Sequence, residues 1–205
     1  MTKIGFIFEC GPQGADKQVC EYLANQLRPG VQLILRTLDN KLNLLTEAGK
    51  VAASLLADGC NCVLIVWDLR PAWPDKKNKP CRHDERQALL QALAQAGVAV
   101  NQPVYLVCIE QELESWLLAD ERLISNYLST PQHAVPIQRV RHPDREPQPK
   151  AKFNKYFQQS HGRRYDDKVH AIKVLRAGTL DVTRMRRSNS FARFESKLLA
   201  CGVHT

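Results

Sequence analysis

Four apolar runs alternate with helical segments over the first 110 residues. The helical segments carry apolar residues at helical spacing, and they are Asp16–Leu27, Leu44–Ala57 and Asp84–Ala96. Strands that are apolar on both faces and separated by helices predict a parallel sheet with helices on both sides. The four expected strands are Lys3–Glu9, Val31–Leu38, Cys62–Asp68 and Pro103–Glu110.

The pattern changes after residue 110. Two further helices are expected at Glu112–Ala119 and Glu121–Leu128, and residues 131–150 are rich in proline and lack apolar periodicity. Residues 151–205 are expected to be helical, with Ser188 or Ser190 as the cap of the last helix. We therefore expect a core at 1–130, a proline-rich linker or loop at 131–150, and a basic helical extension at 151–205 that packs on the core.

The spacing of the cysteines and the lengths of the apolar runs indicate the cellular compartment of the protein. Seven cysteines are scattered without a CxxC pair, which is typical of reduced thiols in a cytoplasmic protein. A zinc site is one interpretation of four possible ligands, and the alternative is that their side chains only pack. The four are Cys60, Cys62, Cys81 and His83. No apolar run approaches the ~20 residues of a membrane span, and the first residues do not resemble a signal peptide.

The positive charge gathers in the second half of the chain. The formal net charge is +8, and most of the arginines and lysines that produce this excess lie between residues 136 and 194. Such a segment favours a polyanionic partner, because binding to phosphates releases counterions. The alternative is a solvated basic surface.

Acidic residues stand where the expected strands end. Glu9 ends the first strand, Asp68 ends the third, and Glu110 ends the fourth, with Glu112 and Glu114 close behind. The carboxyl ends of parallel strands share one edge, where ligands bind. Carboxylates gathered there would repel each other unless a hard cation such as Mg²⁺ or Mn²⁺ lay between them.

Other interpretations of the polar residues remain open. Asp84 and Asp120 are better explained as helix caps or first-turn acids, which the helix dipole favours. Gly11 and Gly14 leave room for a phosphate-binding loop, but ECGPQGADK matches neither GxxxxGK[ST] nor GxGxxG.

Several stretches carry a family likeness. They are the first-strand Glu9, the third-strand Asp68, IEQELESWLLAD (Ile109–Asp120), Pro149-Lys150 and SNSFARFESKL (Ser188–Leu198). Together they resemble an uncharacterised bacterial family of Toprim-like proteins, which share the fold of topoisomerases, primases and OLD-type nucleases. The resemblance implies an α/β fold: a Toprim-like, Rossmannoid, parallel four-stranded sheet between helices, with a C-terminal helical extension.

The resemblance also implies magnesium-dependent phosphodiester chemistry. Glu9 would be a metal-associated acid or a general acid/base, and Asp68 would match the first Asp of the DxD metal motif. Arg70 stands at the second position of that motif, so one usual ligand is missing. Glu114, or else Glu112, is the candidate for the replacement acid.

Three interpretations of Arg70 are open. It contacts the scissile phosphate, it pairs with Asp68 in place of a metal, or it only packs. The expected function is accordingly a Mg²⁺- or Mn²⁺-dependent nuclease of a defence or mobile-element system, with Glu9, Asp68, Glu114 and Arg70 as catalytic residues. The alternative is a catalytically degenerate module that binds nucleic acid or protein.

The basic residues of the second half of the chain suggest the binding partners. We expect nucleic acid as partner, a homodimer, and a partner protein encoded nearby. The expected phosphate contacts are Lys150, Lys152, Arg163, Arg164, Lys168, Arg186 and Arg187.

Overall fold

A computed structural model describes residues 1–71 and 80–202 of the chain. The chain divides into two compact units, which are treated separately below. The first unit comprises residues 1–108 and the C-terminal residues from 193 onward, and the second comprises residues 109–192. The boundaries expected from the sequence, at 130 and 150, both fall inside the second unit.

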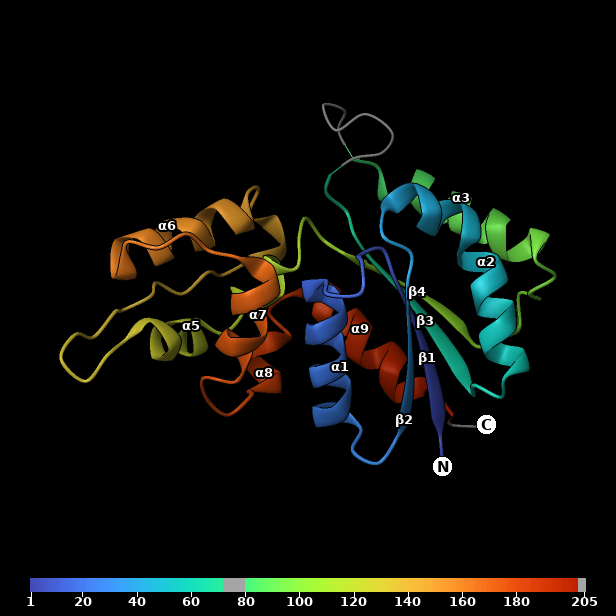
Figure 1. Cartoon of the computed structure of the whole chain (residues 1–205), viewed down its shortest axis with the longest axis horizontal. Coiled ribbons are helices and arrows are strands. Elements are labelled where there is room, and N and C mark those ends of the chain that lie inside the picture. The colour runs from blue at the N-terminus through green and yellow to red at the C-terminus, as the bar shows by residue number, and fades with distance from the viewer. Residues whose placement is uncertain (72–79, 203–205) are drawn as a thin grey trace. The chain divides into compact units, whose positions relative to one another are not determined.

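The first unit is built on a four-stranded parallel sheet, as expected, and the strand order is β2-β1-β3-β4 (Figure 1). Phe8 of β1 aligns with Thr37 of β2 on one side and with Val66 of β3 on the other. The carboxyl ends of the three strands therefore lie at one edge. The strands are β1 (Lys3–Phe8), β2 (Gln32–Thr37), β3 (Cys62–Asp68) and β4 (Val104–Ile109).

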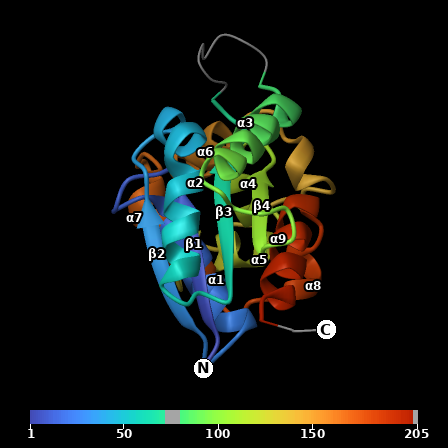
Figure 2. The ribbon, with the colours of Figure 1, turned by 90° about the vertical axis from the view of Figure 1, so that its right-hand side faces the viewer.

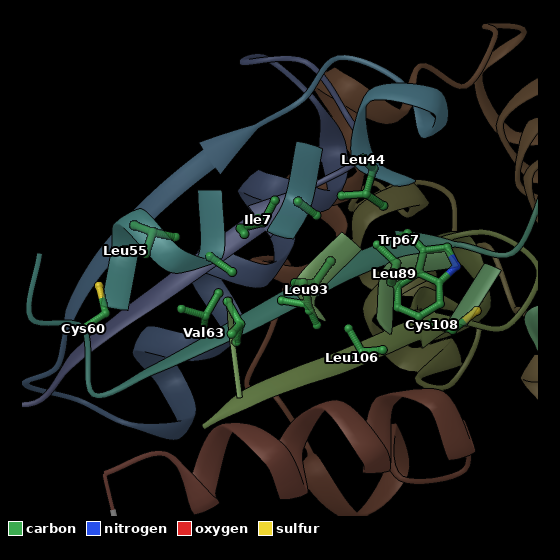
Figure 3. Close-up of a cluster of buried hydrophobic side chains, with 14 of the residues drawn as sticks. Ile7, Leu44, Leu55, Cys60, Val63, Trp67, Leu89, Leu93, Leu106 and Cys108 are labelled. Atoms are coloured by element: carbon green, nitrogen blue, oxygen red, sulfur yellow. The ribbon is translucent and has the colours of Figure 1, made fainter. Parts of the chain in front are cut away.

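Two helices, α2 (Lys41–Ala57) and α3 (Arg82–Gln95), cover one face of the sheet (Figure 2). Alternate residues of the strands point to this face, and Val63, Ile65 and Trp67 of β3 are fully or almost fully buried there (Figure 3). Burial of such side chains is the main favourable contribution to folding. The strands are apolar on both sides because helices cover both faces.

The opposite face is covered by α1 (Ala15–Leu27) and by the C-terminal part of α9 (Asn189–Ala200). Phe6 of β1 lies against Phe194 of α9, with ring centroids 6.3 Å apart. Lys197 of α9 donates to the Leu106 carbonyl at 2.7 Å. The last helix is thus an integral layer of the first unit.

A disulfide links Cys62, the first residue of β3, to Cys201, just after α9. The expectation that all seven cysteines are reduced thiols is therefore wrong, and Cys62 is not available to a zinc site. The other described cysteines, Cys10, Cys20, Cys60, Cys81 and Cys108, are not part of a disulfide. Sequence alone could not pair residues separated by 139 positions.

The second unit is helical and has an aromatic core. Phe153 and Phe157 are buried, and both rings lie 5.1 Å from the ring of Tyr165. The helices are α4 (Glu114–Leu117), α5 (Glu121–Leu128), the 3-10 helix η1 (Pro143–Arg145), α6 (Pro149–His161), α7 (Asp167–Leu175), α8 (Val182–Met185) and the start of α9. Across the described residues of both units, no helix is long and apolar enough to cross a membrane.

Two of the stretches that carry the family likeness meet inside this unit. The indole of Trp116, from ESWLLAD, donates to the Ser190 hydroxyl at 2.8 Å, and it packs edge-on against Phe191 at 5.6 Å. Asp144 accepts from the Ser188 hydroxyl at 2.6 Å and from the Ser190 backbone amide at 2.8 Å. Ser188 also caps α9 by accepting from the amide of Phe191. In the described structure these residues therefore hold the fold of this unit together.

Candidate active site

Lys41, the first residue of α2, lies at the carboxyl edge of the sheet with only 4% of its surface exposed. Its ammonium donates to the backbone carbonyls of Asp68 (2.7 Å), Leu69 (3.2 Å) and Pro71 (2.8 Å). A buried ammonium is tolerated only where oxygen atoms surround it. Lys41 therefore fastens the chain that leaves β3 to the start of α2.

Two glutamates complete the surroundings of this ammonium. Glu85 Oε1 lies 3.1 Å and Glu9 Oε2 lies 4.0 Å from Lys41 Nζ. The second oxygen of Glu85 accepts from the indole of Trp67 at 2.8 Å. One lysine thus connects residues from β1, β3, α2 and α3.

Glu9 directly follows β1, and its Oε2 is buried without a hydrogen-bond partner among the described residues. Burial raises the pKa of Glu9 to about 7, and Asp16 and Glu85 raise it too, against the lowering effect of Lys41. A carboxyl group that titrates near neutral pH can both give and take a proton.

Asp68, the last residue of β3, faces the α1 side of the same edge. Together with Asp16 of α1, it raises the pKa of the Cys10 and Cys20 thiols, which burial raises most. Phe8 of β1 aligns with Val66 of β3, so Glu9 and Asp68 both lie at the carboxyl ends of these neighbouring strands.

The charge of Asp16 acts on Glu9 and on the same two thiols whose pKa Asp68 raises. We call Glu9, Asp16 and Asp68 the acidic edge. Arg70 follows two residues after Asp68, has an exposed side chain, and lies in the turn that Lys41 holds.

The glycines after β1 have a packing explanation. A Cβ on Gly14 would come within 2.3 Å of the Cys10 side chain, and one on Gly11 would come within 3.2 Å of Asp39 Oδ1. Glycine is needed at position 14, where the approach is this close. Packing thus explains Gly14 without a phosphate-binding loop, whereas the longer contact at Gly11 does not by itself require glycine.

The predicted acids Glu112 and Glu114 lie in the second unit. Glu114 is 2% exposed, and its Oε1 has no hydrogen-bond partner among the described residues. Burial raises its pKa to about 7, Lys150 lowers it, and Glu112 raises it. Glu112 accepts from the backbone amide of Lys150 at 3.3 Å, in the first turn of α6, where a negative charge is favoured.

The predicted phosphate contacts differ in their surroundings. Lys150 pairs with Asp167 at 2.8 Å, and Lys152 pairs with Glu146 at 2.6 Å. Arg187 is 12% exposed and is bound to Glu121 and to the Ala119 carbonyl. The remaining four have exposed side chains, and they are Arg163, Arg164, Lys168 and Arg186.

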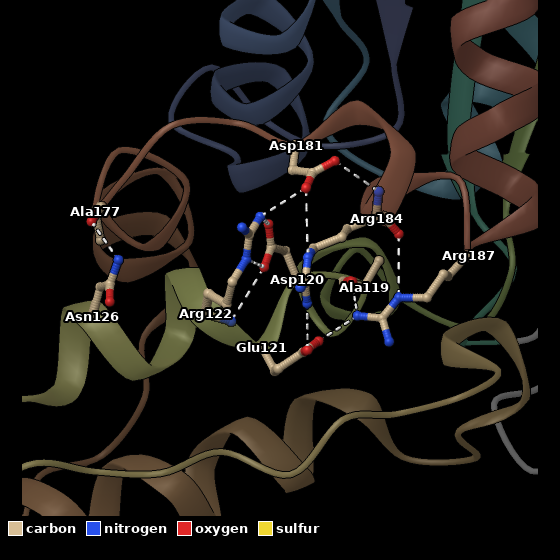
Figure 4. A network of polar contacts seen from close by, with 9 residues as sticks. All are labelled: Ala119, Asp120, Glu121, Arg122, Asn126, Ala177, Asp181, Arg184 and Arg187. Carbon is tan, nitrogen blue, oxygen red and sulfur yellow. Dashed lines mark hydrogen bonds and ion pairs between the residues drawn. The ribbon is translucent and has the colours of Figure 1, made fainter.

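Arg187 belongs to a polar network that joins α5 to α8 (Figure 4). Burial alone would raise the pKa of Glu121, but hydrogen bonds and the charges of Arg187 and Arg184 lower it below its ordinary value. Asp120 caps α5 and binds Arg122 at 2.8 Å, as its interpretation as a helix cap predicted. The contacts within this network account for Arg187 without a phosphate.

Sequence reasoning missed Lys41 and Glu85. The apolar pattern of α2 begins at Leu44, so Lys41 was expected to precede the helix. Asn40, whose side chain accepts from the amide of Asn43, is the signal that could have placed the helix start correctly. Glu85 offered no comparable signal, because an acid in the first turn of a helix is ordinarily solvated.

The chain belongs to the family described as a domain of unknown function (DUF4276), whose model matches residues 13–199. Comparison with curated proteins and with solved structures finds no match.

Proposed function

We propose that this member of the DUF4276 family is a Toprim-like nuclease that cleaves phosphodiester bonds with the help of Mg²⁺ or Mn²⁺. The observation that carries the proposal is the acidic edge. Three carboxylates from β1, β3 and α1 lie where a parallel sheet binds ligands. One oxygen of Glu9 is buried there without a hydrogen-bond partner among the described residues. A cytoplasmic role in defence or on a mobile element belongs to the same proposal.

The donor set suits a metal bound together with substrate. No group of three or more His, Cys, Asp or Glu side chains among the described residues is arranged to hold a metal ion. Mg²⁺ is commonly bound by one or two carboxylates, with water and substrate phosphates as its other ligands. Glu9 and Asp68 could supply those carboxylates. A bound ion would stabilise the negative charge that develops on the phosphate.

Within this proposal the residues of the chain have separate roles. Asp68 supplies ligand oxygens, and Glu9 gives or takes the proton that moves during cleavage. The exposed guanidinium of Arg70 contacts the phosphate, since its planar fork matches two phosphate oxygens. Lys41 keeps the turn that carries Asp68 and Arg70 in place through its three carbonyl contacts.

Lys41 supports a second candidate, a non-catalytic module that binds nucleic acid or protein. Its ammonium already offsets the charges of Glu9 and Glu85. Arg70 stands where the second acid of a metal motif would be. A resident lysine would then replace the metal, and the basic residues of the second unit would provide binding alone.

Calorimetric titration with Mn²⁺ separates the two candidates. The titration uses wild type, Asp68→Asn and the control Asp84→Asn, each with and without a phosphorothioate oligonucleotide that resists cleavage. The nuclease proposal predicts Mn²⁺ binding that strengthens with the oligonucleotide, is lost in Asp68→Asn and persists in the control. It also predicts Mn²⁺-dependent cleavage of a panel of DNA and RNA substrates.

The opposite result has an equally definite meaning. Absence of Mn²⁺ binding at millimolar concentration, even with the oligonucleotide, would reject the nuclease and leave the binding module. Sedimentation velocity on the same samples tests the expected homodimer.

A further inference from the structure

The second unit contains a groove of about 820 Å³ between the segment 133–138 and one side of α6. This volume lies within the range of ~300–1,000 Å³ found for pockets that enclose a small ligand. All of its lining residues belong to the second unit. The groove is therefore complete within one compact body.

The α6 side of the groove is a polar stripe. Lys152, Lys155, Tyr156 and Gln159 line it at positions that share one face of a helix. Phe153 and the neighbouring Phe157 are buried in the aromatic core, which fixes how the helix is rotated. The stripe is thus held facing the groove.

The charge of the groove is positive. Its acid, Glu146, forms an ion pair with Lys152 at 2.6 Å. Lys155 is exposed and forms no ion pair with any residue in the described part of the chain. One uncompensated ammonium and a half-buried tyrosine side chain, that of Tyr156, therefore line the same groove.

The opposite wall adds hydrogen-bonding groups. Residues 134–140 belong to neither a helix nor a strand. The amide side chain of Gln138 lies on this wall, and those of Gln148 and Gln159 lie at the start of α6 and on α6 itself. Each amide can both donate and accept. Such groups suit the edges of nucleobases, as an ammonium suits a phosphate and an aromatic ring suits a base face.

We propose that this groove binds a single-stranded segment of nucleic acid, with a phosphate at Lys155 and a base stacked on Tyr156. A duplex does not fit this description, because its bases are paired and stacked and cannot reach a ring inside a groove. The inference rests on the proposed function for its biological meaning, since it names the substrate class. Binding to the groove can be measured without cleavage.

The test is fluorescence anisotropy of a labelled single-stranded 12-mer in EDTA, where metal-dependent cleavage cannot occur. Tyr156→Leu is expected to weaken binding by about five- to 100-fold, as loss of one stacked base does, while Tyr156→Phe keeps the affinity. Lys155→Ala should weaken binding several-fold. It should also reduce the steepness with which the logarithm of the binding constant falls with the logarithm of salt concentration by about 0.7, the value for one phosphate contact on a single strand. Lys173→Ala removes the same charge from an exposed site on α7 and should leave affinity unchanged.

Several results would overturn the inference. They are equal losses in Lys155→Ala and Lys173→Ala, equal affinity for a duplex, full competition by a mononucleotide or a glutamate-rich peptide, and no binding at all. Circular dichroism of each variant checks that the fold is kept, and Tyr156→Phe provides the matched comparison for the ring.

The two proposals can fail separately. If the 12-mer binds as expected but no substrate is cleaved with Mn²⁺, the groove stands and the nuclease is rejected. If cleavage occurs but the groove variants bind normally, the nuclease stands and the substrate strand lies elsewhere.

Discussion

The indole nitrogen of Trp116 donates a hydrogen bond to the hydroxyl of Ser190, 74 residues further along the chain, at 2.8 Å. Both side chains are fully buried. Asp144 accepts from the same hydroxyl at 3.0 Å. A buried indole N–H without a partner is costly, so Ser190 matters for stability.

Ser190→Ala is expected to lower the free energy of unfolding by about 1–3 kcal/mol, because it leaves the buried N–H of Trp116 unsatisfied. Urea denaturation followed by tryptophan fluorescence measures the change. Asn189→Ala, at the neighbouring exposed position, is the control and should have little effect. Equal stability of Ser190→Ala and wild type would show that the hydrogen bond contributes little.

Lys41→Met is expected to lower the free energy of unfolding by about 3–5 kcal/mol, because Glu85 and three carbonyls lose their buried cation. Lys50→Met, in the same helix but 74% exposed, should cost less than about 1 kcal/mol. Adding Glu85→Gln to Lys41→Met should restore part of the loss, and a double-mutant cycle measures this coupling. A coupling near zero would mean that the two charges do not interact.

Stability should fall as the pH rises from 5 to 8 in metal-free buffer. The pKa of Glu114 is raised to about 7 from an ordinary 4.5. Between these values the folded protein holds a proton that the unfolded chain has lost, so unfolding becomes easier as the pH rises. Glu9, with its pKa also raised to about 7, acts in the same direction.

Glu114→Gln tests this dependence. The neutral amide should remove about 2 kcal/mol of the decline between pH 5 and pH 8, which is most of the free energy that corresponds to the pKa shift. Chemical denaturation at several pH values provides the measurement. If the variant shows the same slope as wild type, Glu114 ionises in the folded protein as it does in water.

Reduction should destabilise the protein, because the Cys62–Cys201 disulfide closes a loop of 139 residues. A loop this long corresponds to a few kcal/mol, about 4–5 in the chain-entropy account. Thermal denaturation with and without dithiothreitol should show a lower midpoint after reduction of wild type. Cys201→Ala should be insensitive to the reductant, and Cys81→Ser, which changes an exposed free thiol, should behave as wild type. An unchanged midpoint in reduced wild type would contradict the expectation.

The fold of the first unit could be predicted because its signals are local. The run Cys62–Asp68 is bounded as expected, and in the second unit α5 also has the expected limits. Apolar runs separated by helical segments leave few arrangements other than a covered parallel sheet. The positions of Glu9 and Asp68 at the ends of β1 and β3 follow from the same pattern.

The partners of those acids could not be predicted. The ammonium of Lys41 reaches oxygen atoms that lie 27 to 44 residues away in the chain, and nothing in an isolated lysine indicates burial. The roles of Trp116 and Ser190 likewise appear only when distant segments meet.

The layer formed by the end of α9 has a consequence for synthesis of the chain. Phe194, Leu198 and Cys201 are buried in the first unit, yet they are synthesised only after the whole second unit. The α1 side of the sheet therefore stays partly uncovered until these residues have left the ribosome, and the exposed apolar surface favours aggregation in the meantime. A fragment that stops at residue 108 would lack this layer, so the first unit alone can be expressed in full only if the residues of the last helix are joined to it.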